Sequence, residues 1–378
     1  MERQLERVPE SEPQLLDTNM EDRIWRLSKE RQRKAAMPRV LKPSDSPWTM
    51  GIQAHHRMWI GADPKDIAAR VPIHTMGVVE QIIPPSAKSG RHRHVREAIF
   101  YIMEGRGYEI HDGQRYDWEA GDIMTVPSYC DHQHFNLDPV NSARFFYSVS
   151  PLVDVMGVHW VEQIEMRDGY RIPQGADPIY DEERQLIGYR TQEGREFRLG
   201  FDNSIQQLID ARKSHIRHVD NPRNTYEEYM KLLEEEVNWR QLVPHVVKAK
   251  DLPWENTQMG HIKFLVTPKT NCGLKTFDAF IQEIPPGGRS GKHCHVAEEV
   301  HKILEGSGYD LQNGVKYDWE ADDVVAIPPN TVHQHFNADR HKPVRFVAFQ
   351  SRWYHHMGHG GIEHLEDAPD FKTQTDQK

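Results

Sequence analysis

The sequence predicts an all-β core built from two sibling modules, each preceded by a helical arm. Residues 90–136 and residues 291–337 align without a gap, and 23 of their 47 positions are identical. Within both copies, short runs of Val, Ile, Tyr and Phe alternate with polar residues between turn signals, which is typical of a β-sandwich or small barrel. Ahead of each copy a T-x-x-E capping signal, at Thr18–Glu21 and at Thr225–Glu228, predicts the start of a helix.

The duplication also sets the expected domain boundaries. Upstream of the aligned blocks, residues 37–48 match residues 243–254, and between the two copies the composition becomes charged and loop-like. The expected parts are a helical arm over 1–49, a first module over 50–160, a linker with a second helical arm over 161–242, a second module over 243–366 and a tail over 367–378.

Composition excludes several classes of function. The chain of 378 residues has 47 Lys+Arg against 57 Asp+Glu, and its net charge of −10 disfavours nucleic acids and anionic membranes as partners. No apolar run approaches the roughly 20 residues that span a bilayer, and the first residues lack the apolar core of a secretory signal. Three cysteines are too few for a disulfide framework. We therefore expect a cytoplasmic protein without a nucleic-acid or membrane partner.

Histidine is abundant, with 23 residues, and it recurs in a fixed pattern. Residues i and i+2 of a strand point to the same face, so the two members of each His-x-His pair converge. A single such pair is usually surface histidine, but here the pair and a third histidine recur at the same spacing, which favours metal binding. Neutral imidazole suits Fe(II), Mn(II), Ni or Zn. The expected ligands are His92, His94 and His132 at site 1, and His293, His295 and His333 at site 2.

The two sites differ at one position. Site 2 has Glu299 where site 1 has Ala98, and the neighbouring Glu97 is expected to point away from the metal on its strand. Site 2 is therefore predicted to use three histidines and one carboxylate, whereas site 1 uses three histidines. Three protein ligands leave three open positions on an octahedral metal.

The two blocks resemble the signature motifs of the cupin family. His293, His295, Glu299 and Gly306 fit its first motif, and Pro328, His333 and Asn337 fit its second. In the first block Gly121, Pro127, His132 and Asn136 fit the second motif. The resemblance implies two double-stranded β-helix barrels, each with a metal inside. These motifs are specific for the fold and much less specific for the reaction.

More narrowly, the stretch HRHVREAIFYIMEG followed by HQHFN is similar to the gentisate 1,2-dioxygenase group, which includes salicylate and 1-hydroxy-2-naphthoate dioxygenases. The resemblance implies an Fe(II)-dependent oxidoreductase, an extradiol-type ring-cleaving dioxygenase of aromatic hydrocarbon catabolism. Its co-substrate O2 would be inserted between the hydroxyl- and carboxyl-bearing carbons of a small aromatic acid. The resemblance also implies a homo-oligomer, a tetramer in that group.

The same resemblance suggests roles for residues around site 1. His134 matches a histidine that assists proton movement, although hydrogen bonding to a ligand is an equal alternative. Gln81 matches a residue that lines the substrate pocket. Arg57 matches an arginine that meets the substrate carboxylate, with a surface salt bridge as the alternative. Phe100 occupies a position where that group has an arginine, so one carboxylate anchor is missing or is supplied elsewhere.

Two other functions stay open. The second module keeps every metal ligand, whereas much of the gentisate group has lost them there. A lyase or decarboxylase that uses Mn(II) at site 2 is therefore an alternative, with His301 facing inward and Lys302 at the rim. The other alternative is a non-catalytic bicupin binding protein. The apolar Phe100 at the position of His301 favours ring chemistry at site 1.

Overall fold

The computed structural model describes residues 20–61, 70–158, 160–200 and 220–371. The chain divides into two compact units, residues 1–38 and residues 39–378. The described part of the first unit is the helix α1 (Met20–Ala35). Its first turn is acidic and its last turn is basic, which complements the helix dipole. Thr18 of the predicted capping box lies outside the described residues.

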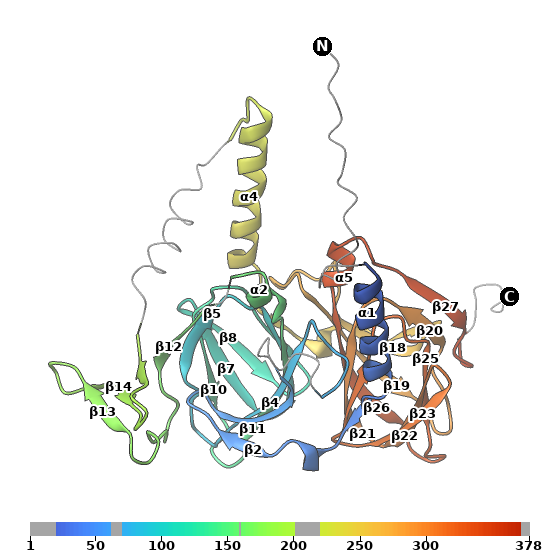
Figure 1. The fold of residues 1–378 in the computed structure, drawn as a ribbon, viewed down its shortest axis with the longest axis horizontal. Helices are drawn as coiled ribbons and strands as arrows, with labels where there is room; N and C mark the ends of the chain where they lie inside the picture. Colours follow the sequence, from blue (N-terminus) through green and yellow to red (C-terminus); the bar gives the residue numbers. More distant parts are fainter. Residues whose placement is uncertain (1–19, 62–69, 159, 201–219, 372–378) are drawn as a thin grey trace, which may run out of the picture. The chain divides into compact units, whose positions relative to one another are not determined.

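The second unit contains two modules, and each consists of a seven-stranded and a five-stranded antiparallel sheet within the described residues (Figure 1). In the first module the larger sheet has the order β16-β9-β6-β11-β4-β3-β2, and the smaller has the order β12-β5-β10-β7-β8. Its strands are β2 (Trp48–Met50), β3 (His55–Ile60), β4 (Gly77–Ile83), β5 (Arg91–His94), β6 (Ala98–Glu104), β7 (Arg106–His111), β8 (Gln114–Glu119), β9 (Ile123–Val126), β10 (His132–Asn136), β11 (Ala143–Val149), β12 (Val161–Glu165) and β16 (Val246–Val247).

The second module repeats this arrangement. Its larger sheet has the order β1-β24-β21-β26-β19-β18-β17, and its smaller sheet has the order β23-β22-β25-β20-β27. Its strands are β1 (Val40–Leu41), β17 (Glu255–Thr257), β18 (Gly260–Val266), β19 (Phe277–Ile284), β20 (Lys292–His295), β21 (Glu299–Glu305), β22 (Ser307–Gln312), β23 (Val315–Glu320), β24 (Val324–Ile327), β25 (His333–Asn337), β26 (Val344–Ser351) and β27 (Ile362–Glu366). The all-β fold predicted from the duplication is confirmed.

The two modules exchange their first strands. β1, which precedes the first module in the chain, pairs with β24 of the second through Val40↔Val325. β16, which precedes the second module, pairs with β9 of the first through Val246↔Met124. Each module is thus completed by a strand from the segment that leads into the other one.

Short elements lie between and beside the sheets. The linker, expected to be loop-like, holds a three-stranded sheet. Its strands are β13 (Asp177–Tyr180), β14 (Leu186–Arg190) and β15 (Glu196–Arg198). The short helices are α2 (Leu152–Val155), α5 (Trp353–His356), η1 (Pro43–Asp45) and η2 (Ala249–Asp251).

The helix α4 (Thr225–Leu242) forms the second arm, as predicted, but its N-cap lies one residue before the expected cap, Thr225. Asn224, not Thr225, is the N-cap, and its side chain accepts a hydrogen bond from the Glu227 backbone N–H at 3.1 Å. Asn caps a helix at least as well as Thr, and Asn224 already has the extended backbone that a cap requires.

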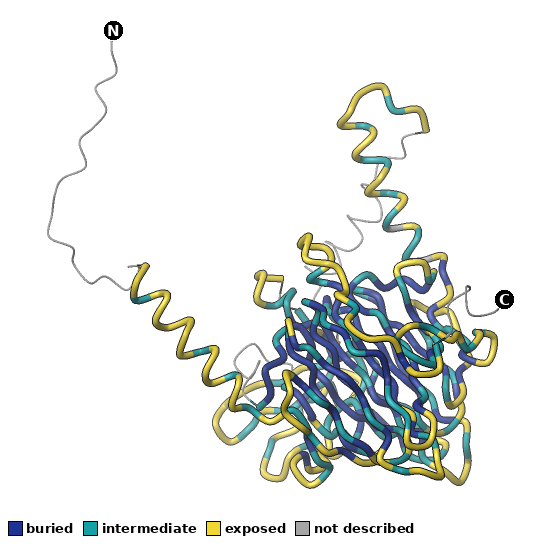
Figure 2. Tube along the Cα trace, turned by 90° about the vertical axis from the view of Figure 1, so that its right-hand side faces the viewer, coloured by how far each residue is buried: buried dark blue, intermediate teal, exposed yellow. Residues whose placement is uncertain are grey.

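The core has three parts. Figure 2 shows the buried stretches, in dark blue, along the strands of the sheets. One cluster lies between the larger sheets of the two modules, where Phe146 stacks on Phe349 with ring centroids 5.4 Å apart. The other two lie inside the modules, around Phe145 in the first and Phe346 in the second. Neighbouring residues of one strand therefore face different surroundings, namely the other module or the interior of their own.

Candidate metal centres

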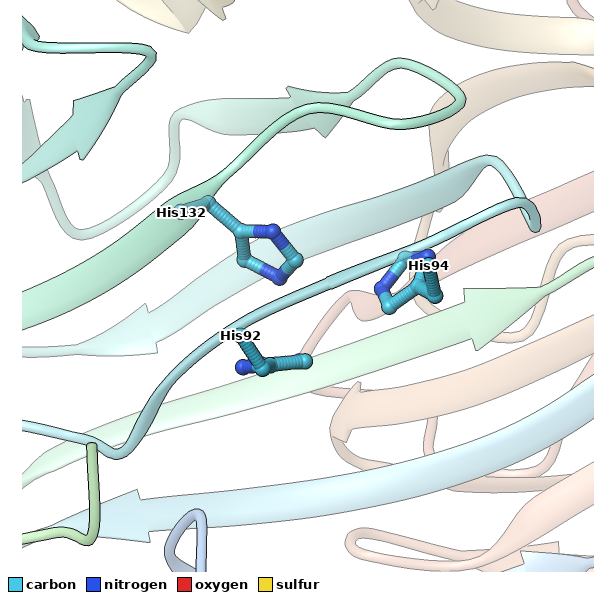
Figure 3. A group of neighbouring side chains, drawn as sticks. All are labelled: His92, His94 and His132. Carbon is cyan, nitrogen blue, oxygen red and sulfur yellow. The ribbon is translucent and has the colours of Figure 1, made fainter. Parts of the chain in front are cut away.

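The three histidines of site 1 come together on the inner face of the smaller sheet. His92 and His94 alternate along β5, and His132 of β10 is paired with His92 across the ladder. The ring centroid of His132 lies 4.1 Å from that of His92 and 4.9 Å from that of His94. One nitrogen from each ring lies within 4.8 Å of the others, and Figure 3 shows the three rings gathered from two strands.

Hydrogen bonds to the backbone orient these rings. Nδ1 of His92 lies 3.2 Å from the Gly90 carbonyl, and Nδ1 of His132 lies 2.9 Å from the Cys130 carbonyl. Nδ1 of His94 lies 2.6 Å from the carbonyl of Arg96. Because a carbonyl only accepts, each Nδ1 must carry the proton, which leaves the lone pair on Nε2. The buried Nε2 of His132 has no hydrogen-bond partner. This is the arrangement expected of imidazoles that bind a metal.

The interior also keeps these imidazoles neutral. Burial lowers the pKa of His94 to about 4, and burial with the charge of His94 lowers the pKa of His92 well below its usual range. The pKa of His132 is lowered well below that range too, by burial and by the two neighbouring rings. Only neutral imidazole binds a metal, so the site is ready to accept a cation at neutral pH.

Site 2 repeats this geometry in the second module. The ring centroid of His333 lies 4.0 Å from that of His293 and 4.9 Å from that of His295. Nδ1 of His295 lies 2.7 Å from the Ala297 carbonyl, and Nδ1 of His333 lies 2.8 Å from the Thr331 carbonyl. Nε2 of both rings is buried without a hydrogen-bond partner. The donor set of site 2 therefore also fits a divalent cation.

The carboxylate position distinguishes the two sites. Oε2 of Glu299 lies 3.2 Å from Nε2 of His295 and accepts a hydrogen bond from the Gln350 side chain at 3.0 Å. Burial would raise the pKa of Glu299, but His301 and His295 hold it well below its usual range. In site 1 this position is Ala98, which is fully buried.

The side chains that line the two sites also differ, because those of site 1 are apolar and those of site 2 are polar. In the first module Phe100 stacks on Tyr147, with centroids 4.5 Å apart and planes 20° apart. In the second module His301 takes the place of Phe100 and contacts the Glu299 carboxylate. The residue matching Tyr147 is Ala348. Site 1 thus has an aromatic wall where site 2 has a charged, hydrogen-bonded one.

His134 lies beside site 1 and is paired with a buried carboxylate. Its Nδ1 is 3.3 Å from Oε2 of Glu109, and its ring lies 5.0 Å from that of Phe100. Burial raises the pKa of Glu109 to about 7. Burial lowers the pKa of His134, although Glu109 opposes the change. In the second module Asp310 accepts from Nδ1 of His335 at 2.8 Å, and it raises the pKa of His335 despite burial.

The larger sheet separates Gln81 from Arg57. Residues paired across strands share a face, and Gln81 is paired with Phe145 of the interior cluster. Arg57 is paired with Glu80 on the opposite face, 3.9 Å from its carboxylate, and its guanidinium covers the Trp48 ring. The structure therefore places Gln81 and Phe100 on the interior face and does not bring Arg57 to it.

His56 is a residue of this interior face that the sequence reasoning missed. It is paired with Gln81, its Nε2 is buried without a hydrogen-bond partner, and its charge contributes to the low pKa of His92. The alternation of β3 could have identified it, because Arg57 and His56 must face opposite ways.

The predicted position of Lys302 was wrong. It was expected at the rim of site 2, but its side chain is fully buried between the modules. Its Nζ lies 3.3 Å from Oε2 of Glu80 and donates to the Asp322 carbonyl at 2.6 Å. His301 faces inward as expected, so Lys302, the next residue of β21, faces the other module. Glu97 likewise faces away from site 1, as expected, and accepts hydrogen bonds from the second module.

Comparison with known proteins identifies the class. Residues 79–149 and 280–349 match the family model of the Cupin domain. The chain therefore carries two cupin domains and is a bicupin of the cupin superfamily. It is similar to oxalate decarboxylase from Lactobacillus farciminis in a formate complex, with 16% identity, a TM-score of 0.55 and coverage of 88% of this chain and 89% of that chain. At this identity the likeness shows the fold alone.

Two curated relatives match shorter segments. One is 5-aminosalicylate 1,2-dioxygenase from Comamonas sp, 25% identical over 87 residues, which are 22% of this chain and 22% of the relative. The other is auxin-binding protein 4 from Zea mays, 29% identical over 102 residues, which are 25% of this chain and 50% of the relative. The matched segments thus span between about a fifth and a half of these relatives. Among the described residues, none of the helices is long and apolar enough to cross a membrane.

Proposed function

We propose that the protein is a metal-dependent dioxygenase that opens the ring of a hydroxylated aromatic acid, such as gentisate, salicylate or a substituted relative, at site 1. The observation that carries the proposal is the contrast between the two interiors. Site 1 combines three histidines, an empty carboxylate position at Ala98 and the stacked pair of Phe100 and Tyr147. An apolar aromatic wall beside a cation with open positions suits an aromatic ring that carries two oxygen donors. The partial likeness to 5-aminosalicylate 1,2-dioxygenase supports the same reaction class.

His92, His94 and His132 would hold the metal. Fe(II) at this position would supply Lewis acidity and redox chemistry toward O2, which together allow both oxygen atoms to enter between the hydroxyl- and carboxyl-bearing carbons. A carboxylate ligand as in site 2 would fill one more position, so Ala98 keeps space for substrate and O2.

The other side chains position the substrate and move its proton. Phe100 and Tyr147 would pack against the ring, and the Gln81 amide would donate a hydrogen bond to a substrate oxygen. His134 would take the proton of the ring hydroxyl on its nitrogen, and Glu109 beside Nδ1 would stabilise the resulting imidazolium. The low pKa of buried His134 means that it starts neutral and can accept this proton.

A second candidate function is a lyase or decarboxylase that uses Mn(II) at site 2. The observation that favours it is the buried set of Glu299, His301, Asp310 and His335, with His301 in contact with Glu299 and His335 bonded to Asp310. Such a lining suits a small anionic substrate, to which the ring N–H groups of His301 and His335 would donate hydrogen bonds.

Substitutions at equivalent positions of the two modules distinguish the two proposed functions. The protein would be reconstituted with Fe(II) or with Mn(II), and O2 consumption and ring opening would be measured with a set of hydroxybenzoates. We expect His94→Ala to abolish O2 uptake and the matched His295→Ala to retain most of it. The opposite pattern would move the chemistry to site 2, and turnover without O2 would exclude a dioxygenase. Binding without turnover in every metal form would favour a binding protein.

We also propose that the protein forms homo-oligomers. Helix α4 exposes Tyr229 and Leu232, whose side chains are 57% and 62% exposed. The two residues are three positions apart and therefore neighbours on one helix face, where they leave an apolar surface for a second copy. Light scattering after size-exclusion chromatography tests this, and a monomer would contradict it. The cytoplasmic location stays a prediction.

A further inference from the structure

A third cluster of metal-ligating side chains lies outside both predicted sites. We propose that His111, Cys130 and His245 form a zinc-type site that ties the chain ahead of the second module to the first module. One donor atom from each residue lies within 4.8 Å of the others. All three are buried, with exposed fractions of 2%, 4% and 5%. His111 ends β7, Cys130 precedes β10, and His245 lies between α4 and β16.

One of the two imidazoles, that of His245, is held as metal ligands usually are. Metal-ligating histidines donate their second ring N–H to a carbonyl or a carboxylate. Nε2 of His245 lies 2.9 Å from the Arg240 carbonyl, which fixes the lone pair on Nδ1. Nε2 of His111 lies 2.8 Å from Oε2 of Glu109, but the geometry between them is not that of a hydrogen bond. The two Nδ1 atoms face each other at 2.7 Å, so His111 can donate a proton to the lone pair of His245, and a bound cation would take the place of that proton.

The duplicated module provides an internal comparison. Gln312, Thr331 and Arg39 occupy the positions of His111, Cys130 and His245. The backbone framework is the same, because the Ala326 N–H donates to the Arg39 carbonyl at 2.7 Å and the Thr125 N–H donates to the His245 carbonyl at 2.8 Å. The fold therefore does not require metal ligands at these positions, yet all three donors occur together in the first module.

The donor set selects the cation. One thiolate and two neutral imidazoles suit a borderline ion such as Zn(II), and they leave a fourth position for water. Two nitrogens of a tetrahedral zinc site lie about 3.3 Å apart, so the rings would separate by roughly half an ångström on binding. The site would also support site 1, because the Cys130 carbonyl accepts the hydrogen bond from His132.

Cobalt substitution tests the proposal with a readout that is independent of activity. The full-length protein would be loaded with Co(II), and the near-ultraviolet thiolate-to-cobalt charge-transfer band would be recorded. We expect the band in the wild type and its loss in Cys130→Thr, which introduces the residue that the second module has at this position. Zinc analysis of protein purified without added metal should show about one ion per chain fewer in the same variant.

Controls separate this site from the others. His94→Ala removes a ligand of site 1 and Cys294→Ser removes the thiol nearest to site 2, and both should keep the band. His111→Gln should lose it, and circular dichroism of Cys130→Thr would show that loss of the band is not loss of fold. A wild type without the band, or a Cys130→Thr variant with unchanged zinc, would overturn the proposal and leave His111 and His245 as a hydrogen-bonded pair.

Discussion

Glu97 and Glu298 make the same contact in opposite directions between the two modules. Glu97 of the first module accepts hydrogen bonds from the backbone N–H and the hydroxyl of Thr276, at 3.0 and 2.8 Å. Glu298 of the second module accepts from the backbone N–H and the hydroxyl of Thr75, both at 2.7 Å. Both carboxylates are buried. Glu97 and Glu298 occupy equivalent positions of the two copies, so the same contact occurs twice between the modules, and we call this pair of contacts the reciprocal lock.

Removing the charge on either side of this lock should destabilise the protein. In Glu97→Gln and in Glu298→Gln a neutral amide replaces the carboxylate, so the buried donors lose their charged acceptor. We expect each variant to lose about 2 kcal/mol of unfolding free energy in urea titrations. The exposed Glu119→Gln, which breaks a surface pair with Lys250, should change it by less than about 1 kcal/mol. Equal effects of the buried and exposed variants would contradict the lock.

The sequence predicted the histidine clusters because their geometry is local. An i, i+2 pair on a strand converges wherever the strand lies, and the third histidine follows at the same spacing in both copies. Glu97 could be predicted to face away from site 1 by the same alternation. Its partner Thr276 could not be predicted, because nothing in the local pattern indicates which chain segment covers the outer face.

The features that sequence reasoning missed depend on contacts between the modules. Val40 falls within the arm expected over 1–49 and Val246 at the start of the second module, and only the assembled sheets show that each pairs with the other module. Lys302 was expected at the rim of site 2, but it is buried between the modules, where Glu80 of the other module compensates its charge. His245 lies far in sequence from His111 and Cys130, so spacing could not group them.

Exchanging the wall residue of site 1 for that of site 2 should impair turnover of an aromatic substrate. Phe100→His removes the stack on Tyr147 and introduces a polar ring beside it. We expect kcat/KM for the best hydroxybenzoate to fall at least tenfold, which corresponds to about 1.4 kcal/mol. The matched His301→Phe in the second module should leave it within about twofold. A larger effect of His301→Phe would place the ring chemistry in the second module.

Arg57→Met distinguishes a structural role from a substrate contact. Arg57 lies on the outer face near Glu80 and covers the Trp48 ring, so we expect a loss of about 1 kcal/mol of stability and an unchanged KM. A contact with the substrate carboxylate would instead raise KM tenfold or more at nearly unchanged stability. Steady-state kinetics and urea unfolding of the same preparation separate these two outcomes.

His56 should make the folded protein sensitive to mild acid. Burial, with smaller contributions from His55 and Arg167, lowers the pKa of His56 to about 4 from its usual 6.5. Because the folded-state pKa is the lower one, its stabilising effect is present above pH 6.5 and is lost as the pH falls toward 4. Between pH 7 and pH 5 this single group should account for a loss of about 2 kcal/mol of unfolding free energy.

Ile262 occupies the matching position in the second module, paired with Gln282 as His56 is with Gln81. His56→Ile should therefore lose about 2 kcal/mol less than the wild type over the same pH interval in urea titrations. All other histidines are common to both proteins, so an equal loss in the two would show that His56 titrates normally in the folded state.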